Sequence, residues 1–220
     1  MSARFSGKPF LAVSGALSRD PKETLESESM TNTFKESDLA PENGWAELPL
    51  TLWQSHAPSF VSGNPSGDAL RVRYYRRDAD GALVGKAWFG PGTQGPPGHG
   101  HGGSMAALLD EVMGAAAWLG GFPVLAASIT VDFRKMIPLR SIVVIEARVT
   151  EVSGRKVTTE ARLHDSNGDA YAEGKGLFIS LGGDSKNKVF ESWKTKAEDV
   201  SSSAGGNETI SRAIKALTTD

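Results

Sequence analysis

The sequence predicts an α+β protein in which one antiparallel sheet wraps around a single buried helix. Three observations predict it: a hairpin pattern near the start of residues 69–182, one long apolar helical segment, and four extended segments after it. Tight-turn residues join the last three segments. Because antiparallel neighbours accept two-residue turns and parallel strands need long crossovers, the sheet is expected to be antiparallel.

The first element is a hairpin. Leu70, Val72 and Tyr74 alternate with arginines and a tyrosine, which gives the period of two that is typical of a strand. Asp80-Gly81 supplies the turn, and residues 82–89 continue as a second extended segment.

The second element is the central helix, expected over residues 104–119. The stretch before it, Gly90 to Gly98, is too rich in glycine and proline for regular structure. Gly120-Gly121 ends the helix. Apolar residues lie on nearly all of its faces, and this indicates a buried helix.

Four extended segments complete the sheet, with turns at Ser153-Gly154 and Asn167-Gly168. The segments are 125–134, 142–150, 156–164 and 170–181. Regular alternation predicts two faces for the first of them: Ala127, Ile129, Val131 and Phe133 toward the core, and Ala126, Ser128, Thr130 and Asp132 away from it. A hairpin, a buried helix and then a meander is the hotdog arrangement.

The chain ends are expected to lie outside this domain. Residues 1–68 are polar and form an N-terminal extension, partly disordered or helical, with its best helical candidate at Trp45–Trp53. Residues 183–220 form a flexible C-terminal tail. The first nineteen residues hold basic residues and serines but no acid, as mitochondrial transit peptides do. We predict a cytoplasmic protein. The composition of the first nineteen residues makes the mitochondrial matrix the alternative.

The composition excludes several classes of function. A net charge of -2 leaves no excess of positive charge for nucleic acid. The absence of cysteine excludes a disulfide framework, a thiolate zinc site and a cysteine nucleophile. No apolar run reaches the roughly 18 residues that a membrane span requires.

The predicted helix start is the best candidate for chemistry. Unpaired N–H groups at a helix start stabilise an oxygen that becomes negative, and Gly102 and Gly103 would let a carbonyl approach them closely. Asp110 lies on about the same side of the helix, roughly 12 Å further along. One chain therefore cannot bring both groups to one carbon atom, but two antiparallel helices in a dimer can. Asp110 would then act as general base or as nucleophile.

Simpler interpretations exist for the same residues. Asp110 could only accept a hydrogen bond from a buried neighbour. Glu111 points about 100° away from it and fits a structural role. His99 and His101 alternate as in some metal sites, but no further ligand lies near them in the sequence. The glycine-rich stretch also lacks the Lys-Ser/Thr ending of a phosphate-binding loop.

The residues His101-Gly102-Gly103, six further residues and Asp110, together with I-T-V-D-F-R-K-M-I-P-L from Ile129, resemble the hotdog acyl-CoA thioesterases of the phenylacetyl-CoA thioesterase type and their eukaryotic relatives. Gly154-Arg155-Lys156 and the segment 172–179 extend the resemblance over about Leu70–Leu181. The resemblance implies a homodimer or dimer of dimers that hydrolyses CoA thioesters without a cofactor.

The resemblance also implies roles by position. The oxyanion donor is Gly102 or Gly103, the loop histidine is His101 and the carboxylate is Asp110. A threonine that handles water in several members is replaced by Ala126, and Ser128 is expected to substitute from the same face of the strand. The expected substrate contacts are Ser128, His99, Ala126, Arg155 and Lys156.

The sequence therefore predicts hydrolysis of an aliphatic or aryl acyl-CoA. The alternatives are a hotdog protein that binds acyl-CoA without hydrolysing it, or one that catalyses a biosynthetic tailoring step, because a fold does not fix a function.

Overall fold

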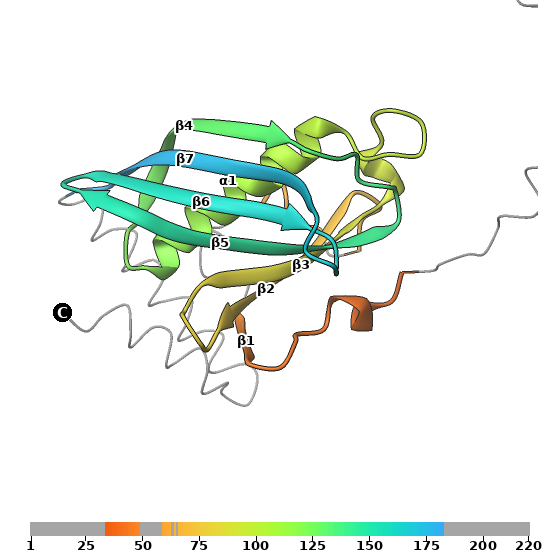
Figure 1. Ribbon diagram of the computed structural model, residues 1–220, viewed down its shortest axis with the longest axis horizontal. Helices are drawn as coiled ribbons and strands as arrows, with labels where there is room; N and C mark the ends of the chain where they lie inside the picture. Colours follow the sequence, from red (N-terminus) through yellow and green to blue (C-terminus); the bar gives the residue numbers. More distant parts are fainter. Residues whose placement is uncertain (1–33, 49–58, 63, 65, 183–220) are drawn as a thin grey trace, which may run out of the picture. The chain divides into compact units, whose positions relative to one another are not determined.

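The computed structural model describes residues 34–48, 59–62, 64 and 66–182. Within these residues, seven strands form one antiparallel sheet in the order β1-β2-β3-β5-β6-β7-β4, and α1 lies against one face of it (Figure 1). The elements are η1 (Glu36–Leu39), β1 (Trp45–Leu48), β2 (Leu70–Arg77), β3 (Leu83–Phe89), η3 (Pro91–Thr93), α1 (Gly102–Leu119), β4 (Val124–Phe133), β5 (Ser141–Ser153), β6 (Lys156–His164) and β7 (Ala170–Ser180). The predicted hotdog fold is confirmed.

The predicted turns join the strands as expected. Gly154 between β5 and β6 has φ +57°, and Gly168 between β6 and β7 has φ +89°. This left-handed conformation costs glycine little and other residues more, which is why tight hairpins use it. Register therefore follows from the turn residues.

The helix α1 supplies the centre of the core. Leu108, Leu109, Val112 and Met113 are fully buried against the sheet. Removing one such side chain from water contributes about 1.5–3 kcal/mol, so these residues hold α1 firmly in place. A strip on the other side of α1, including Ala107 and Asp110, stays half-buried.

The predicted helix at Trp45–Trp53 is wrong in its described part, because Trp45–Leu48 is strand β1. β1 pairs with β2, and the Trp45 ring packs on Tyr75 with their centroids 5.7 Å apart. Sheet pairing overrides the weak helical pattern here. A signal was present in the sequence, since Leu48 precedes Pro49 and a residue before proline avoids the α conformation. Residues 49–53 lie outside the described residues.

The predicted faces of β4 are correct from Ser128 to Phe133 and wrong at Ala126, because a β-bulge interrupts the strand at Ala127. Ala126 pairs with Phe178, whereas Ser128 pairs with Leu177. Paired residues share a face and adjacent residues do not, so Ala126 faces α1 and Ser128 faces the outer side of the sheet.

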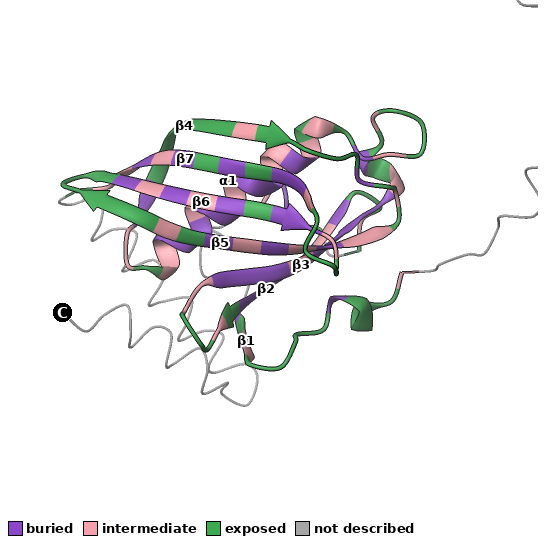
Figure 2. Ribbon diagram, in the orientation of Figure 1, coloured by how far each residue is buried: buried purple, intermediate pink, exposed green. Residues whose placement is uncertain are grey.

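The predicted core face of β4 is exposed to a large extent. β4 lies at the edge of the sheet and is mostly exposed in Figure 2. Of this face, Ile129 is 40% exposed and Phe133 54%, and Leu125, which precedes the bulge, is 64% exposed. A soluble sheet normally protects such an edge with charges, bulges or a covering segment. The apolar edge of β4 is therefore unusual for a surface that stays in water.

Candidate active site

The start of α1 is held by His101. His101 is the N-cap residue, and its Nδ1 accepts the N–H of Gly103 at 2.8 Å. Because Nδ1 accepts, the neutral ring carries its proton on Nε2. A Cβ added to Gly103 would lie 2.8 Å from the same Nδ1. Glycine at this position is thus required by the cap.

Gly102 is the first residue of α1, and its N–H has no acceptor among the described residues. A Cβ there would lie 3.4 Å from the Phe133 ring, an ordinary contact. Of the two predicted oxyanion donors, the structure therefore leaves the Gly102 amide free and engages the Gly103 amide with His101. A free amide at a helix start carries partial positive charge.

Asp110 lies two turns further along α1 on the half-buried strip. Its carboxylate forms no hydrogen bond or ion pair with any described residue. Burial, and then the charge of Glu111, raise the pKa of Asp110 above its usual value. A carboxyl that holds its proton more tightly than usual and lacks partners is well suited to proton transfer.

Glu111 is the next residue on α1 and is fully bonded. The Tyr74 hydroxyl donates to Glu111 Oε1 at 2.6 Å, and the Ser59 hydroxyl donates to Oε2. Burial, and then Glu111, raise the pKa of Tyr74 well above its usual value, so Tyr74 stays protonated and donates. The structural interpretation of Glu111 agrees with these contacts.

The two strand residues predicted beside Asp110 lie on opposite faces. Ala126 faces α1, and its methyl group replaces the hydroxyl of the resembled family. Ser128 faces away from α1, so it does not substitute within one chain as predicted. The cause is the bulge at Ala127, for which the sequence carries no glycine or proline signal.

Arg155 and Lys156, which were predicted as substrate contacts, lie far from the start of α1. Arg155 donates from Nε to the Ser180 carbonyl at 3.1 Å, and Lys156 starts β6 beside it. Leu181, next in the chain, is hydrogen-bonded to Pro123 beyond the C-terminal end of α1. Arg155 and Lys156 therefore lie at the end of α1 opposite to Gly102, about 27 Å away for an 18-residue helix.

His99 lies in the loop that precedes α1. Its Nδ1 is 3.0 Å from the Pro97 carbonyl, and its backbone forms a bridge with Pro138. These contacts fix the loop. Among the described residues, no three histidine, aspartate or glutamate side chains lie close enough to hold a metal ion.

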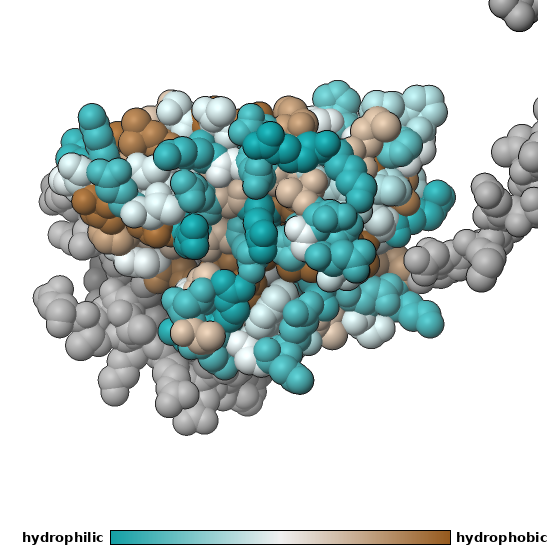
Figure 3. Space-filling view, in the orientation of Figure 1, coloured by the Kyte–Doolittle hydropathy of each residue, from teal (hydrophilic) through white to brown (hydrophobic). Residues whose placement is uncertain are grey.

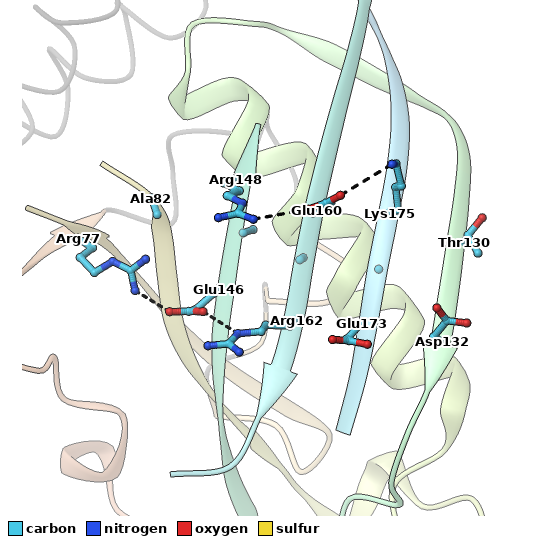
Figure 4. Close-up of a pocket in the computed structure, with 13 residues that line it drawn as sticks. Arg77, Ala82, Thr130, Asp132, Glu146, Arg148, Glu160, Arg162, Glu173 and Lys175 are labelled. Atoms are coloured by element: carbon cyan, nitrogen blue, oxygen red, sulfur yellow. Dashed lines mark hydrogen bonds and ion pairs between the residues drawn. The ribbon is translucent and has the colours of Figure 1, made fainter. Parts of the chain in front are cut away.

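A hollow of about 510 Å³ lies on the outer face of the sheet, away from α1 (Figure 4). Its charged side chains pair with one another: Glu146 binds Arg77 and Arg162, and Glu160 lies beside Arg148 and Lys175. They form a hydrophilic band across the sheet (Figure 3). Four cations and four anions line the hollow, so no net charge is left to attract a CoA phosphate.

The chain matches known proteins over the central part of its length. Residues 97–172 match the family described as the thioesterase superfamily. The chain is 40% identical over 94 residues to acyl-coenzyme A thioesterase THEM4 of Xenopus laevis, covering 42% of each chain. It is 28% identical over 161 residues to THEM4 of Bos taurus, covering 73% of this chain and 63% of that one.

A crystal structure described as a thioesterase superfamily protein shares 32% identity, with a TM-score of 0.48 over 50% of this chain and 54% of that one. The matched segments span about half the length of the curated relatives.

The class of protein follows from the sheet order, the central helix and the family match of residues 97–172: the chain contains a hotdog domain. Within that class, residues 97–172 match the thioesterase superfamily, and this segment holds the helix start and Asp110. The resemblance inferred from the sequence is confirmed. No helix among the described residues is long and apolar enough to cross a membrane.

Proposed function

We propose that the protein hydrolyses an acyl-CoA thioester to a free acid and CoA. The observation that carries this proposal is the pair of unengaged groups on α1, the Gly102 amide and the Asp110 carboxylate. Similarity to proteins named acyl-coenzyme A thioesterases supports the choice of substrate. Among the described residues, α1 is the only α-helix, so no other α-helix start is available.

The Gly102 N–H would donate to the thioester oxygen as negative charge develops on it. In the first route, Asp110 takes a proton from water while the water oxygen attacks the carbonyl carbon. The C–S bond then breaks, and the CoA thiolate leaves and takes up the proton. In the second route, the Asp110 carboxylate attacks the carbon itself, expels the CoA thiolate and leaves a mixed anhydride that water hydrolyses. His101 holds the loop in both routes because it caps α1.

A second copy of the chain would complete the site. The separation of Gly102 and Asp110 along α1, roughly 12 Å, is too long for one reacting carbon. The apolar edge of β4 offers the surface: its backbone is open to pairing, and Leu125, Ile129 and Phe133 are exposed beside it. Pairing of β4 with β4 of a second copy would bury these side chains. A homodimer is the smallest assembly of this kind, and a dimer of dimers is the larger one.

A steady-state assay tests the activity. Purified protein is expected to release free thiol from members of a series of acetyl-, octanoyl-, palmitoyl- and phenylacetyl-CoA. Absence of thiol release from the whole series would contradict the proposal.

Mixing two inactive variants tests the shared site. Asp110→Asn keeps the Gly102 amide, and Gly102→Pro keeps Asp110. If each site takes one group from each copy, random mixing restores about one quarter of wild-type activity, because half of the dimers are mixed and each holds one intact site. Sites contained within one chain would show no recovery.

The alternative function is binding of acyl-CoA without hydrolysis, and Ala126 favours it because no hydroxyl faces α1 at this position. Isothermal titration with intact acyl-CoA distinguishes the two functions: tight binding without thiol release would support the alternative.

The compartment, cytoplasm or mitochondrial matrix, is a separate proposal that fluorescence microscopy of the tagged full chain tests.

A further inference from the structure

A cavity of about 370 Å³ lies beside the start of α1, on the side toward β2. Its floor is the helix surface at Gly103, Ser104 and Ala107, and its opposite wall is the segment Phe60–Val61. None of the residues predicted as substrate contacts from the sequence lines this cavity. Its volume is within the range of about 300–1,000 Å³ that is usual for small-molecule sites.

The cavity borders the candidate groups along α1, although neither Gly102 nor Asp110 lines it. Gly103 follows the free amide of Gly102 directly. At the other end, Ala107 and Asp110 are three residues apart, so they are neighbours on the helix surface. The near end of the cavity is therefore one residue from the Gly102 amide, and its far end is one helical turn from Asp110.

The lining is mainly apolar. Apolar side chains come from both walls: Phe60, Val61, Ala69, Leu70 and Ala107. The charged residue of the lining is Asp68, and it lies at the exposed rim. Phe60 is 95% exposed, which is a costly position for a large aromatic side chain unless a ligand or a partner covers it.

The wall is fixed to the helix by Glu111. Ser59 donates to Glu111, and the same hydroxyl accepts the N–H groups of Val61 and Ser62 at 3.2 and 3.4 Å. Ser62 is buried and hydrogen-bonds Tyr74, which itself donates to Glu111. One carboxylate therefore holds the turn that carries Phe60.

We propose that this cavity binds the acyl group of the substrate, that Phe60 and Ala107 set its length, and that Glu111 is a positioning residue for the wall. The ligand class is an unbranched aliphatic acyl chain of medium length, because the lining is mainly apolar and the volume is near the lower end of the usual range for small-molecule sites. The proposal rests on the proposed function, since it places the thioester at Gly102.

Binding of thioether analogues tests the proposal without turnover. S-ethyl-CoA and S-octyl-CoA share the CoA part and differ in the chain. By isothermal titration, the wild-type chain is expected to bind S-octyl-CoA at least about tenfold more tightly than S-ethyl-CoA, because each buried methylene contributes favourably.

Two variants should remove that preference while the affinity for S-ethyl-CoA stays unchanged. Ala107→Trp fills the cavity and should bring the ratio of affinities close to one. Phe60→Ala should reduce the ratio severalfold, and it cannot threaten folding because the side chain is exposed. Val152→Ala, an exposed apolar residue on β5 outside the cavity, is the matched control and should leave the ratio unchanged.

The role of Glu111 has its own readout. Glu111→Ala frees the turn and should lower the ratio as Phe60→Ala does, whereas Glu111→Gln keeps one of the two oxygen acceptors and should restore part of it. If the ratio of affinities for S-octyl-CoA and S-ethyl-CoA is unaltered in both Ala107→Trp and Phe60→Ala, the proposal is overturned. If Phe60→Ala changes the oligomer mass and leaves this ratio unaltered, Phe60 belongs to an interface instead. Failure of the proposed function is distinguishable, because it appears as absence of thiol release whatever the binding ratio is.

Discussion

Two neighbouring carboxylates on α1, Glu111 and Asp110, differ in their hydrogen-bond partners. Glu111 accepts hydrogen bonds from Tyr74 and Ser59 and links α1 to segments 37 and 52 residues away. Asp110, one position earlier and about 100° around the helix, has no partner among the described residues. The first carboxylate is used to hold the structure, and the second is left available. This contrast separates a structural acid from a reactive one better than burial does, because both residues are half-buried.

The largest effect is expected at Asp110. Asp110→Asn should lower kcat about 10²–10⁴-fold, because proton transfer by a positioned side chain contributes this much. Glu111→Gln is the matched control, and it should retain activity within an order of magnitude. Thiol release measured over the acyl-CoA series checks both. Equal losses in the two variants would remove the distinction between the carboxylates.

The next effect is expected at the helix start. Gly102→Pro removes the free N–H at the first helical position, where proline is tolerated, and should lower kcat about 10²–10³-fold. Gly102→Ala keeps the N–H and adds only an ordinary contact with Phe133, so it should stay close to wild type. If the alanine variant loses as much activity as the proline variant, crowding and not the amide is responsible.

Stability should depend on Glu111 far more than on Asp110. Glu111→Ala removes the acceptor of the Tyr74 and Ser59 hydroxyls and leaves Tyr74 with its contact to Ser62, which should cost about 1–3 kcal/mol of unfolding free energy. Glu111→Gln keeps one of the two acceptor oxygens and should recover part of this loss. Urea unfolding at fixed protein concentration measures it, with Asp110→Ala as the comparison that should not lose stability.

The cap at His101 should contribute about 1 kcal/mol. His101→Ala removes the acceptor of the Gly103 N–H and should destabilise the chain by that amount, whereas His101→Asn restores an N-cap acceptor. If both variants unfold at the same urea concentration, the Gly103 contact is not a stabilising cap. Activity of the asparagine variant close to wild type would show that His101 acts through the loop and not on the substrate.

The smallest effect is a pH dependence. The pKa of Asp110 is raised by burial first and by Glu111 second, so the native chain holds this proton more tightly than the unfolded chain does. The stability gained in this way is present below the ordinary carboxyl pKa of about 3.9 and is lost as pH rises through the raised value. Asp110→Asn should therefore raise Tm at pH 7, and the difference should shrink toward acidic pH. A lower Tm for the variant at pH 7 would contradict the assignment.

The pH dependence of activity should show the same effect of Glu111 on the pKa of Asp110. If Asp110 acts ionised, the acidic limb of the pH–rate profile follows its raised pKa. Glu111→Gln removes the second cause of the increase, so the limb should move to lower pH but keep the part that is due to burial. A limb at the same pH in both proteins would indicate that another group controls it.

Much of the fold was predictable because its signals are local. Gly154 and Gly168 mark hairpins on their own, and the apolar segment before Gly120 predicts the central helix. The strand at Trp45–Leu48 was missed because four residues carry little periodicity and pairing with β2 decides their conformation. Only Pro49 pointed to an extended backbone.

The candidate site was predictable where it lies on one helix and not where it depends on distant contacts. The spacing of Gly102 and Asp110 follows from helix geometry. The bulge at Ala127, which separates Ala126 from Ser128, arises from pairing with β7 and leaves no trace in the composition of β4. The contact of Ser59 with Glu111 joins residues 52 positions apart, so no local pattern could predict the wall of the cavity.

The apolar edge of β4 also has a consequence for how the protein is handled. If a second copy completes each site, the fraction of working sites follows mass action. Dilution would then lower the activity per milligram, and a higher protein concentration would raise Tm. Rates compared between variants of this chain are meaningful only at matched concentrations well above the dissociation constant of the assembly.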